Sequence, residues 1–60
     1  MFKKIIAYLL EKGGYTEGSI GRALGCSQST VNRIKSGQMP KYNDGVKLRE
    51  MYDEMMRASK

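Results

Sequence analysis

Apolar residues recur along the first part of the chain at the spacing of one helix face. The members of this stripe, at i, i+3, i+4, i+7 and i+8, are Phe2, Ile5, Ile6, Leu9 and Leu10. This spacing predicts an amphipathic helix whose apolar stripe is buried. Gly13 and Gly14 follow and predict its end, because glycine readily takes the left-handed conformation of a helix C-cap.

Two shorter helical segments follow, each preceded by a hydroxyl residue. Thr16 and Ser27 are suited to cap the second and third helices by accepting hydrogen bonds from first-turn amides. The inward positions are Ile20, Ala23 and Leu24 in the second helix, and Val31 and Ile34 in the third. Gly18 and Gly21 each disfavour the second helix by about 1 kcal/mol relative to alanine, so tertiary packing must hold it.

A fourth helix is predicted after a loop that carries the only proline, Pro40, and it should begin near Asn43 or Asp44. Its broad apolar face comprises Val46, Leu48, Met51, Tyr52, Met55 and Met56. No segment has the alternation and β-branched enrichment of strands. We therefore expect an all-α fold, a compact bundle of four to five helices. The expected core comprises Ile5, Ile6, Leu9, Ile20, Leu24, Val31, Ile34, Leu48 and Met51.

The length and the cysteine count exclude several classes of function. Sixty residues permit one small core, so we expect a single domain over residues 1–60 without a buried catalytic cleft. The sequence has no histidine and one cysteine, which excludes an internal disulfide and a Cys/His metal cluster. We expect no enzymatic activity, no cofactor and no small-molecule ligand. Cys26 lies at an apolar turn position and is interpreted as a buried, reduced thiol.

Charge narrows the range of partners. Eleven Lys and Arg against six Asp and Glu give a net charge of +5, which favours a polyanionic partner such as nucleic acid, an anionic membrane or an acidic protein. A charge that serves solubility alone is the alternative. The apolar run 5–10 is too short for a membrane span or a signal peptide. The cations do not lie opposite one apolar face, so we expect a cytoplasmic protein that binds no membrane.

The segment 16–37 has the pattern of a helix-turn-helix. A tight turn over residues 25–27 forces its two helices to cross steeply. Gly21 supplies a small residue where the helices approach, and Gly25 tolerates the positive φ of the turn. The apolar positions that would seal the contact are Ile20, Leu24, Cys26, Val31 and Ile34.

The outward face of the third helix carries hydrogen-bonding side chains at i, i+1, i+4, i+5 and i+8. They are Gln28, Ser29, Asn32, Arg33 and Ser36. Gln and Asn can pair bidentately with adenine, and Arg can pair with guanine. An ordinary solvated helix face would carry more Glu and Lys, so we interpret this face as base-reading. A polar face without a partner is the alternative.

The run LGCSQSTVNRIKSG, residues 24–37, resembles the core of phage Cro and repressor proteins and their bacterial relatives, the lambda-repressor-like family. The resemblance implies a DNA-binding transcriptional regulator, encoded by a phage or a bacterium and associated with the nucleoid, whose third helix lies in the major groove. It implies base contacts by Gln28, Ser29, Asn32 and Arg33. Glu17 departs from the pattern, because many relatives carry there a Gln that helps bind phosphate. The helical C-terminal part also differs from the dimerising strands of some Cro proteins.

Phosphate contacts are expected around the rim of this face, from cations and from backbone amides near Gly37. The resemblance implies further phosphate contacts at the N-cap Ser27 and at the start of the second helix. The residues expected to make them are Thr16, Arg22, Ser27, Lys35, Gln38 and Lys41.

We also expect two copies to act together on a near-palindromic operator, as a weak homodimer or a dimer formed on DNA. One such helix contacts only about four base pairs, too few among roughly 10⁶ competing sites. The contact should use Met39, Tyr42, Met55 and Met56. Alternatively, Met55 and Met56 merely cover the first helix. A different class of function, a protein-interaction module such as an antitoxin or adaptor that uses this fold without DNA, also remains open.

Overall fold

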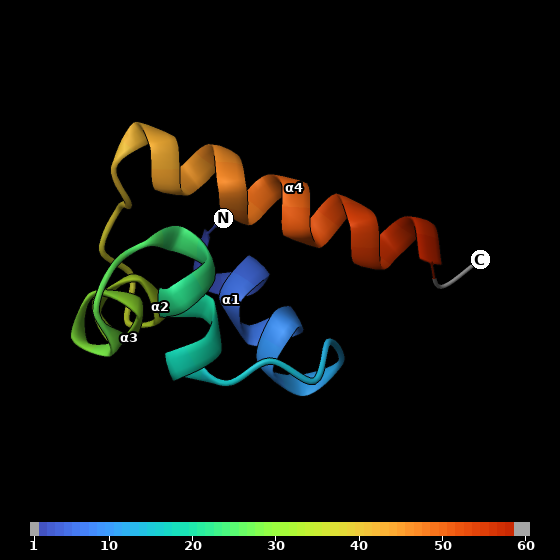
Figure 1. The fold of residues 1–60 in the computed structure, drawn as a ribbon, viewed down its shortest axis with the longest axis horizontal. Coiled ribbons are helices and arrows are strands. Elements are labelled where there is room, and N and C mark those ends of the chain that lie inside the picture. The colour runs from blue at the N-terminus through green and yellow to red at the C-terminus, as the bar shows by residue number, and fades with distance from the viewer. Residues whose placement is uncertain (1, 59–60) are drawn as a thin grey trace.

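The computed structural model of the chain describes residues 2–58 and shows four helices there (Figure 1). The helices are α1 (Phe2–Glu11), α2 (Glu17–Leu24), α3 (Gln28–Lys35) and α4 (Tyr42–Ala58). None of the described residues is in a strand, so the prediction of an all-α fold is confirmed. The domain expected over residues 1–60 also includes residues 1, 59 and 60, which lie outside the described part.

The apolar stripes of all four helices meet in one core, as the sequence predicts, but Ala23, which was predicted to point inward, is exposed. The buried side chains are Ile5, Ile6 and Leu9 of α1, Ile20 of α2, Val31 and Ile34 of α3, and Leu48 of α4. α1 packs against α3 and α4, and α2 packs mainly against α3. α4 also packs against α2, less extensively, so each helix contacts two others around the core.

Two residues predicted for the core, Leu24 and Met51, are only partly buried and pack at its edge. Leu24 is the last residue of α2, where the helix gives way to the exposed Gly25. Met51 lies on α4, which crosses the other helices as an outer layer (Figure 1). Side chains on the flank of such a layer keep one side toward solvent, so the central core is smaller than predicted.

α4 begins at Tyr42, one residue before the earliest predicted start. The amide of Gly45 donates to the carbonyl oxygen of Lys41 at 2.8 Å, so the first turn forms directly after the loop. Its buried face is narrower than predicted, because Val46 and Met56 are exposed while Leu48 is fully buried. Val46 precedes Leu48 by two residues, which at 3.6 residues per turn places it on the opposite side of the helix. Among residues 2–58, neither α4 nor any other helix has the length and apolarity of a membrane span.

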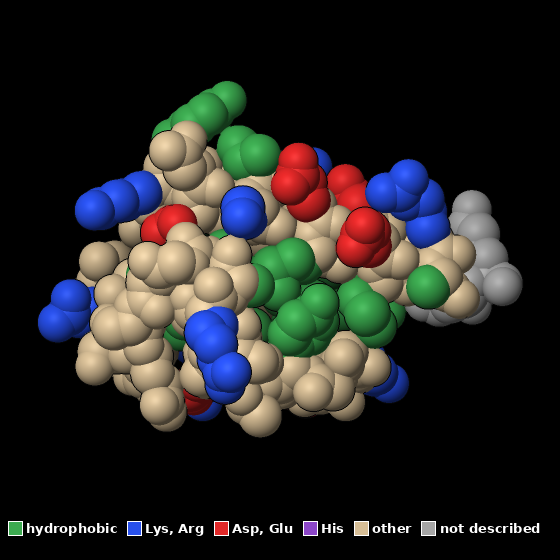
Figure 2. Space-filling model, in the orientation of Figure 1, with side chains coloured by type: hydrophobic (Ala, Val, Ile, Leu, Met, Phe, Trp, Pro, Cys, Tyr) green, Lys and Arg blue, Asp and Glu red, His purple; other side chains and the backbone are tan. Residues whose placement is uncertain are grey.

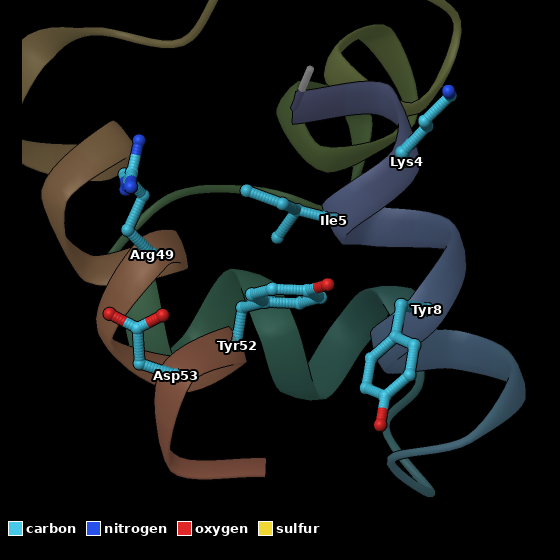
Figure 3. Close-up of a pocket in the computed structure, with 6 residues that line it drawn as sticks. All are labelled: Lys4, Ile5, Tyr8, Arg49, Tyr52 and Asp53. Atoms are coloured by element: carbon cyan, nitrogen blue, oxygen red, sulfur yellow. The ribbon is translucent and has the colours of Figure 1, made fainter. Parts of the chain in front are cut away.

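Besides its apolar side chains in the core, α4 makes an aromatic and a polar contact with the rest of the fold. Tyr8 of α1 and Tyr52 of α4 meet edge to face, with ring centroids 5.1 Å apart and planes at 71°. Figure 3 shows the Tyr52 ring extending from α4 toward α1, beside Ile5, with the Tyr8 ring further along α1. They line a surface hollow of about 440 Å³ between α1 and α4. Lys47 of α4 donates to the carbonyl oxygen of Ala23 at 3.4 Å, near the C-terminal end of α2.

Candidate nucleic-acid interface

α2 and α3 approach closely across the turn at residues 25–27. Gly25 has a φ of 75°, in the left-handed region, and ends α2. The amide of Cys26 donates to the carbonyl oxygen of Gly21 at 2.8 Å. A Cβ atom on Gly21 would lie 2.9 Å from the carbonyl oxygen of Cys26, closer than real Cβ atoms come. The positive φ predicted at Gly25 is therefore confirmed. Gly21 is closely approached as well, but by the backbone of the turn rather than by α3 itself.

Thr16 and Ser27 cap α2 and α3, as predicted. Thr16 Oγ1 accepts from the amide of Ser19 at 3.0 Å, and Ser19 Oγ accepts from the amide of Thr16 at 2.9 Å. Ser27 Oγ accepts from the amide of Thr30 at 3.3 Å. Both caps are exposed at helix N-termini, where first-turn amides and the helix dipole favour an anion. Their phosphate contacts stay a prediction.

The outward face of α3 carries the four side chains predicted to contact bases. Gln28, Ser29, Asn32 and Arg33 are all exposed, and together they line a shallow hollow of about 380 Å³. We call these four residues the α3 face. The fifth member of the same hollow is Glu17 of α2. Base contact by these side chains stays a prediction, but the fold does bring them together on one open surface.

A second hollow, of about 270 Å³, lies between α3 and the loop that leads to α4. Arg33, Gln38 and Lys41 are among the residues that line it, with Asp44 of α4. Arg33, a member of the α3 face, therefore lines both hollows and lies near Gln38 and Lys41, which are predicted to contact phosphate. Gln38 and Lys41 are exposed, as is Arg22 on α2, so none of these three is withdrawn from a partner.

Glu17 joins α2 to α3 through polar contacts that the sequence did not reveal. Lys35 Nζ lies 3.0 Å from Glu17 Oε2, and Asn32 Nδ2 donates to Glu17 Oε1 at 3.4 Å. The hydrogen bond from Lys35 holds the pKa of Glu17 below its ordinary value of 4.5, against the opposing effect of desolvation. The carboxylate is thus charged at neutral pH and already has a cation beside it. The phosphate contact of Lys35 stays a prediction, and its amine is bonded to Glu17 in the free protein.

Charge is unevenly distributed over the molecule. Four of the six acidic residues lie on α4: Asp44, Glu50, Asp53 and Glu54. Between residues 16 and 37 the sequence has three cations and the single carboxylate of Glu17. In Figure 2 the acidic side chains gather along α4, while the part formed by α2 and α3 shows mainly neutral and basic groups. The segment that carries the α3 face therefore has a net positive charge, in contrast to α4.

The residues predicted to mediate self-association do not form one patch. Met39 and Tyr42 are 73% and 83% exposed, and with Val46 they line an apolar hollow of about 240 Å³ at the start of α4. Met56 is exposed as well, but it lies fourteen residues beyond Tyr42, roughly 21 Å along the helix. Met55 packs against the core and is partly buried. Only the start of α4 offers a continuous apolar surface among these residues.

Cys26 is partly rather than fully buried, because it lies in the turn at the border of the second hollow. Burial, together with the nearby charge of Asp44, raises the pKa of its thiol above the ordinary value of 9.0. The side chain is therefore a protonated thiol at neutral pH. Within residues 2–58, no group of ligating side chains is placed to hold a metal ion.

The chain was also compared with known proteins. Neither the protein-family models, nor the curated proteins, nor the solved structures contain a match to it. What the protein does must therefore be inferred from the arrangement of its own residues.

Proposed function

We propose that this protein binds double-stranded DNA in a sequence-specific manner as a transcriptional regulator of the Cro and repressor type, with α2 and α3 as a helix-turn-helix. The observation that carries the proposal is the α3 face. It presents four exposed, uncharged or guanidinium side chains on one helix, in a segment of net positive charge. The resemblance of residues 24–37 to the lambda-repressor-like family supports the same function.

The α3 face would enter the major groove. Arg33 would pair with O6 and N7 of a guanine, and Gln28 or Asn32 with N6 and N7 of an adenine. Arg22 and Lys41, on either side of α3 in the chain, would contact phosphates and set the position of the helix. The capped N-termini at Thr16 and Ser27 would add amide contacts to the backbone. Such contacts supply affinity, and the base contacts supply selectivity.

Two copies would bind a near-palindromic operator, with their α3 helices about 34 Å apart. The fold measures 31 × 20 × 19 Å. Two copies of this size can touch each other when their α3 helices are about 34 Å apart. The apolar surface of Met39 and Tyr42 is available for the contact. A weak homodimer, or a dimer formed only on DNA, follows from the small size of this surface.

Selection of binding sites from random duplex DNA tests the proposal. Enrichment of one sequence, in two half-sites one helical turn apart, is the expected result. Failure to enrich any sequence would contradict DNA recognition and leave the protein-interaction module as the better explanation.

Fluorescence anisotropy on the selected duplex and on a scrambled one then separates the roles of the side chains. Arg33→Ala should cost about 1–3 kcal/mol on the selected duplex and little on the scrambled one. Lys41→Ala should weaken both alike and reduce the salt slope by about one. Arg57→Ala is the matched control, because it removes the same charge at the far end of α4. Equal losses on both duplexes for Arg33→Ala would contradict its assignment to a base contact.

A further inference from the structure

Glu17 is a single carboxylate on an otherwise neutral or basic surface. It lies at the first position of α2 and lines the same hollow as the α3 face. Its side chain is 20% exposed, so it is largely enclosed between the two helices. A carboxylate close to DNA phosphates is unfavourable for binding. Its presence therefore calls for an explanation other than affinity.

The two oxygens of this carboxylate bond to different residues of α3. Oε2 accepts from Lys35 Nζ at 3.0 Å, and Oε1 accepts from Asn32 Nδ2 at 3.4 Å. Lys35 thus has its amine drawn toward α2 while 47% of its side chain remains exposed. Asn32 has one amide N–H directed to Glu17, which leaves its other N–H and its Oδ1 for a partner. Those are the two groups that a bidentate contact with adenine requires.

We propose that Glu17 is a positioning residue that sets the base selectivity of α3, by orienting the amide of Asn32 and by withholding the amine of Lys35 from phosphate. This inference rests on the proposed DNA-binding function. When Asn32 is bonded to Glu17, the positions of its Nδ2 donor and its Oδ1 acceptor are fixed relative to the bases. A free Asn32 amide can rotate by 180°, which exchanges donor and acceptor and permits contacts with other bases. A Lys35 amine held by Glu17 adds little to the affinity for arbitrary sequences. The carboxylate thus lowers binding to all DNA and raises the contrast between sequences.

Glu17→Gln tests this role with little change of shape. The variant keeps an oxygen that accepts a hydrogen bond but removes the charge that holds Lys35. Its binding to the parent's selected duplex and to a scrambled duplex is measured by anisotropy over a salt series, after thermal melting has shown that it folds. We expect tighter binding to the scrambled duplex and a salt slope steeper by about one, because Lys35 becomes free to contact a phosphate. Because a phosphate contact strengthens binding to both duplexes alike, the affinity ratio should change little in Glu17→Gln. Glu17→Ala also removes the oxygen that accepts from Asn32, so for this variant we expect the ratio of selected to scrambled affinity to fall about tenfold.

Two further variants make the result specific. Glu54→Gln removes the same charge from the exposed surface of α4 and should leave the affinity ratio and the salt slope unchanged. The double variant Glu17→Gln with Lys35→Met should return to the salt slope of the parent, because no amine is released. A role of Glu17 in folding alone would move the melting temperature but not the salt slope.

The outcomes separate this inference from the proposed function. A parent that discriminates between duplexes, with Glu17→Gln behaving like Glu54→Gln, would overturn the role of Glu17 and leave DNA recognition intact. A parent that binds no duplex in preference to another would overturn the proposed function and this inference together. A double variant that keeps the steeper slope would overturn the part assigned to Lys35.

Discussion

Replacing Gly21 by alanine should destabilise the fold, although alanine is the better helix former. Gly21 is buried inside α2 at the point where the turn to α3 passes over it. The added Cβ would meet the carbonyl oxygen of Cys26 at 2.9 Å and backbone atoms of Ser27 at 3.4 Å. All of these are backbone atoms, so no flexible side chain can move aside.

The magnitude follows from two opposing effects. The turn must retreat from 2.9 Å to at least the 3.4 Å at which ordinary contact begins, and this movement stretches the 2.8 Å hydrogen bond from Cys26 to Gly21. Overpacking of this kind costs about 1–3 kcal/mol, and the helix propensity of alanine returns about 1 kcal/mol. Because the clash is with backbone, we take the upper part of the range and expect a net loss of about 1–2 kcal/mol. In a domain of this size, the melting temperature should fall by roughly 5–15 °C.

Gly18→Ala is the matched control in the same helix. Its Cβ would meet only Thr16 Oγ1, at 3.8 Å, so the variant should gain about 0.5–1 kcal/mol from lower chain entropy in the unfolded state. Thermal melting followed by circular dichroism measures both variants. A Gly21→Ala protein that melts at or above the parent's temperature would refute the close approach of α2 to the turn.

Three further predictions concern stability and reactivity. Leu48→Ala should lower the free energy of unfolding, measured by urea denaturation, by about 2–5 kcal/mol, because the side chain is fully buried. Tyr42 is 83% exposed, so Tyr42→Ala should change this free energy by less than about 0.5 kcal/mol. Because the pKa of Glu17 is lowered in the folded state, its charge stabilises the fold at pH values above the ordinary pKa of 4.5. This contribution is lost as the pH falls through the folded-state pKa. The difference in melting temperature between the parent and Glu17→Gln should therefore vanish in acid. Iodoacetamide should alkylate Cys26 more slowly than free cysteine at pH 8, and at the ordinary rate in urea, because burial raises the pKa of the thiol.

Features that depend on near neighbours in the chain were predictable from the sequence. The stripe of α1, the caps Thr16 and Ser27 and the turn at Gly25 follow from local spacing and from conformational preferences of single residues. The close approach at Gly21 was also predictable, because a three-residue turn allows few geometries. These features were enough to place the α3 face on an open surface.

Features that depend on distant residues were not predictable. Glu17 and Lys35 are eighteen residues apart, and no periodic pattern relates residues on different helices. The partial burial of Leu24 and Met51 follows from how the helices are layered, whereas an apolar stripe reports only which side of a helix is inward. The hydrogen bond from Lys47 to the carbonyl of Ala23 joins residues twenty-four positions apart, and no sequence pattern predicts it.

The packing of α1 against α4 has a consequence for the synthesis of the protein. Ile6 and Leu9 are translated well before Leu48, the α4 residue that is buried in the same core. A nascent chain cannot complete the burial of this stripe until α4 has left the ribosome, so we expect these helices to fold only after α4 has emerged. Products that stop before Tyr42 keep the stripe exposed and should be removed by proteases. Only chains that include α4 would then display the α3 face.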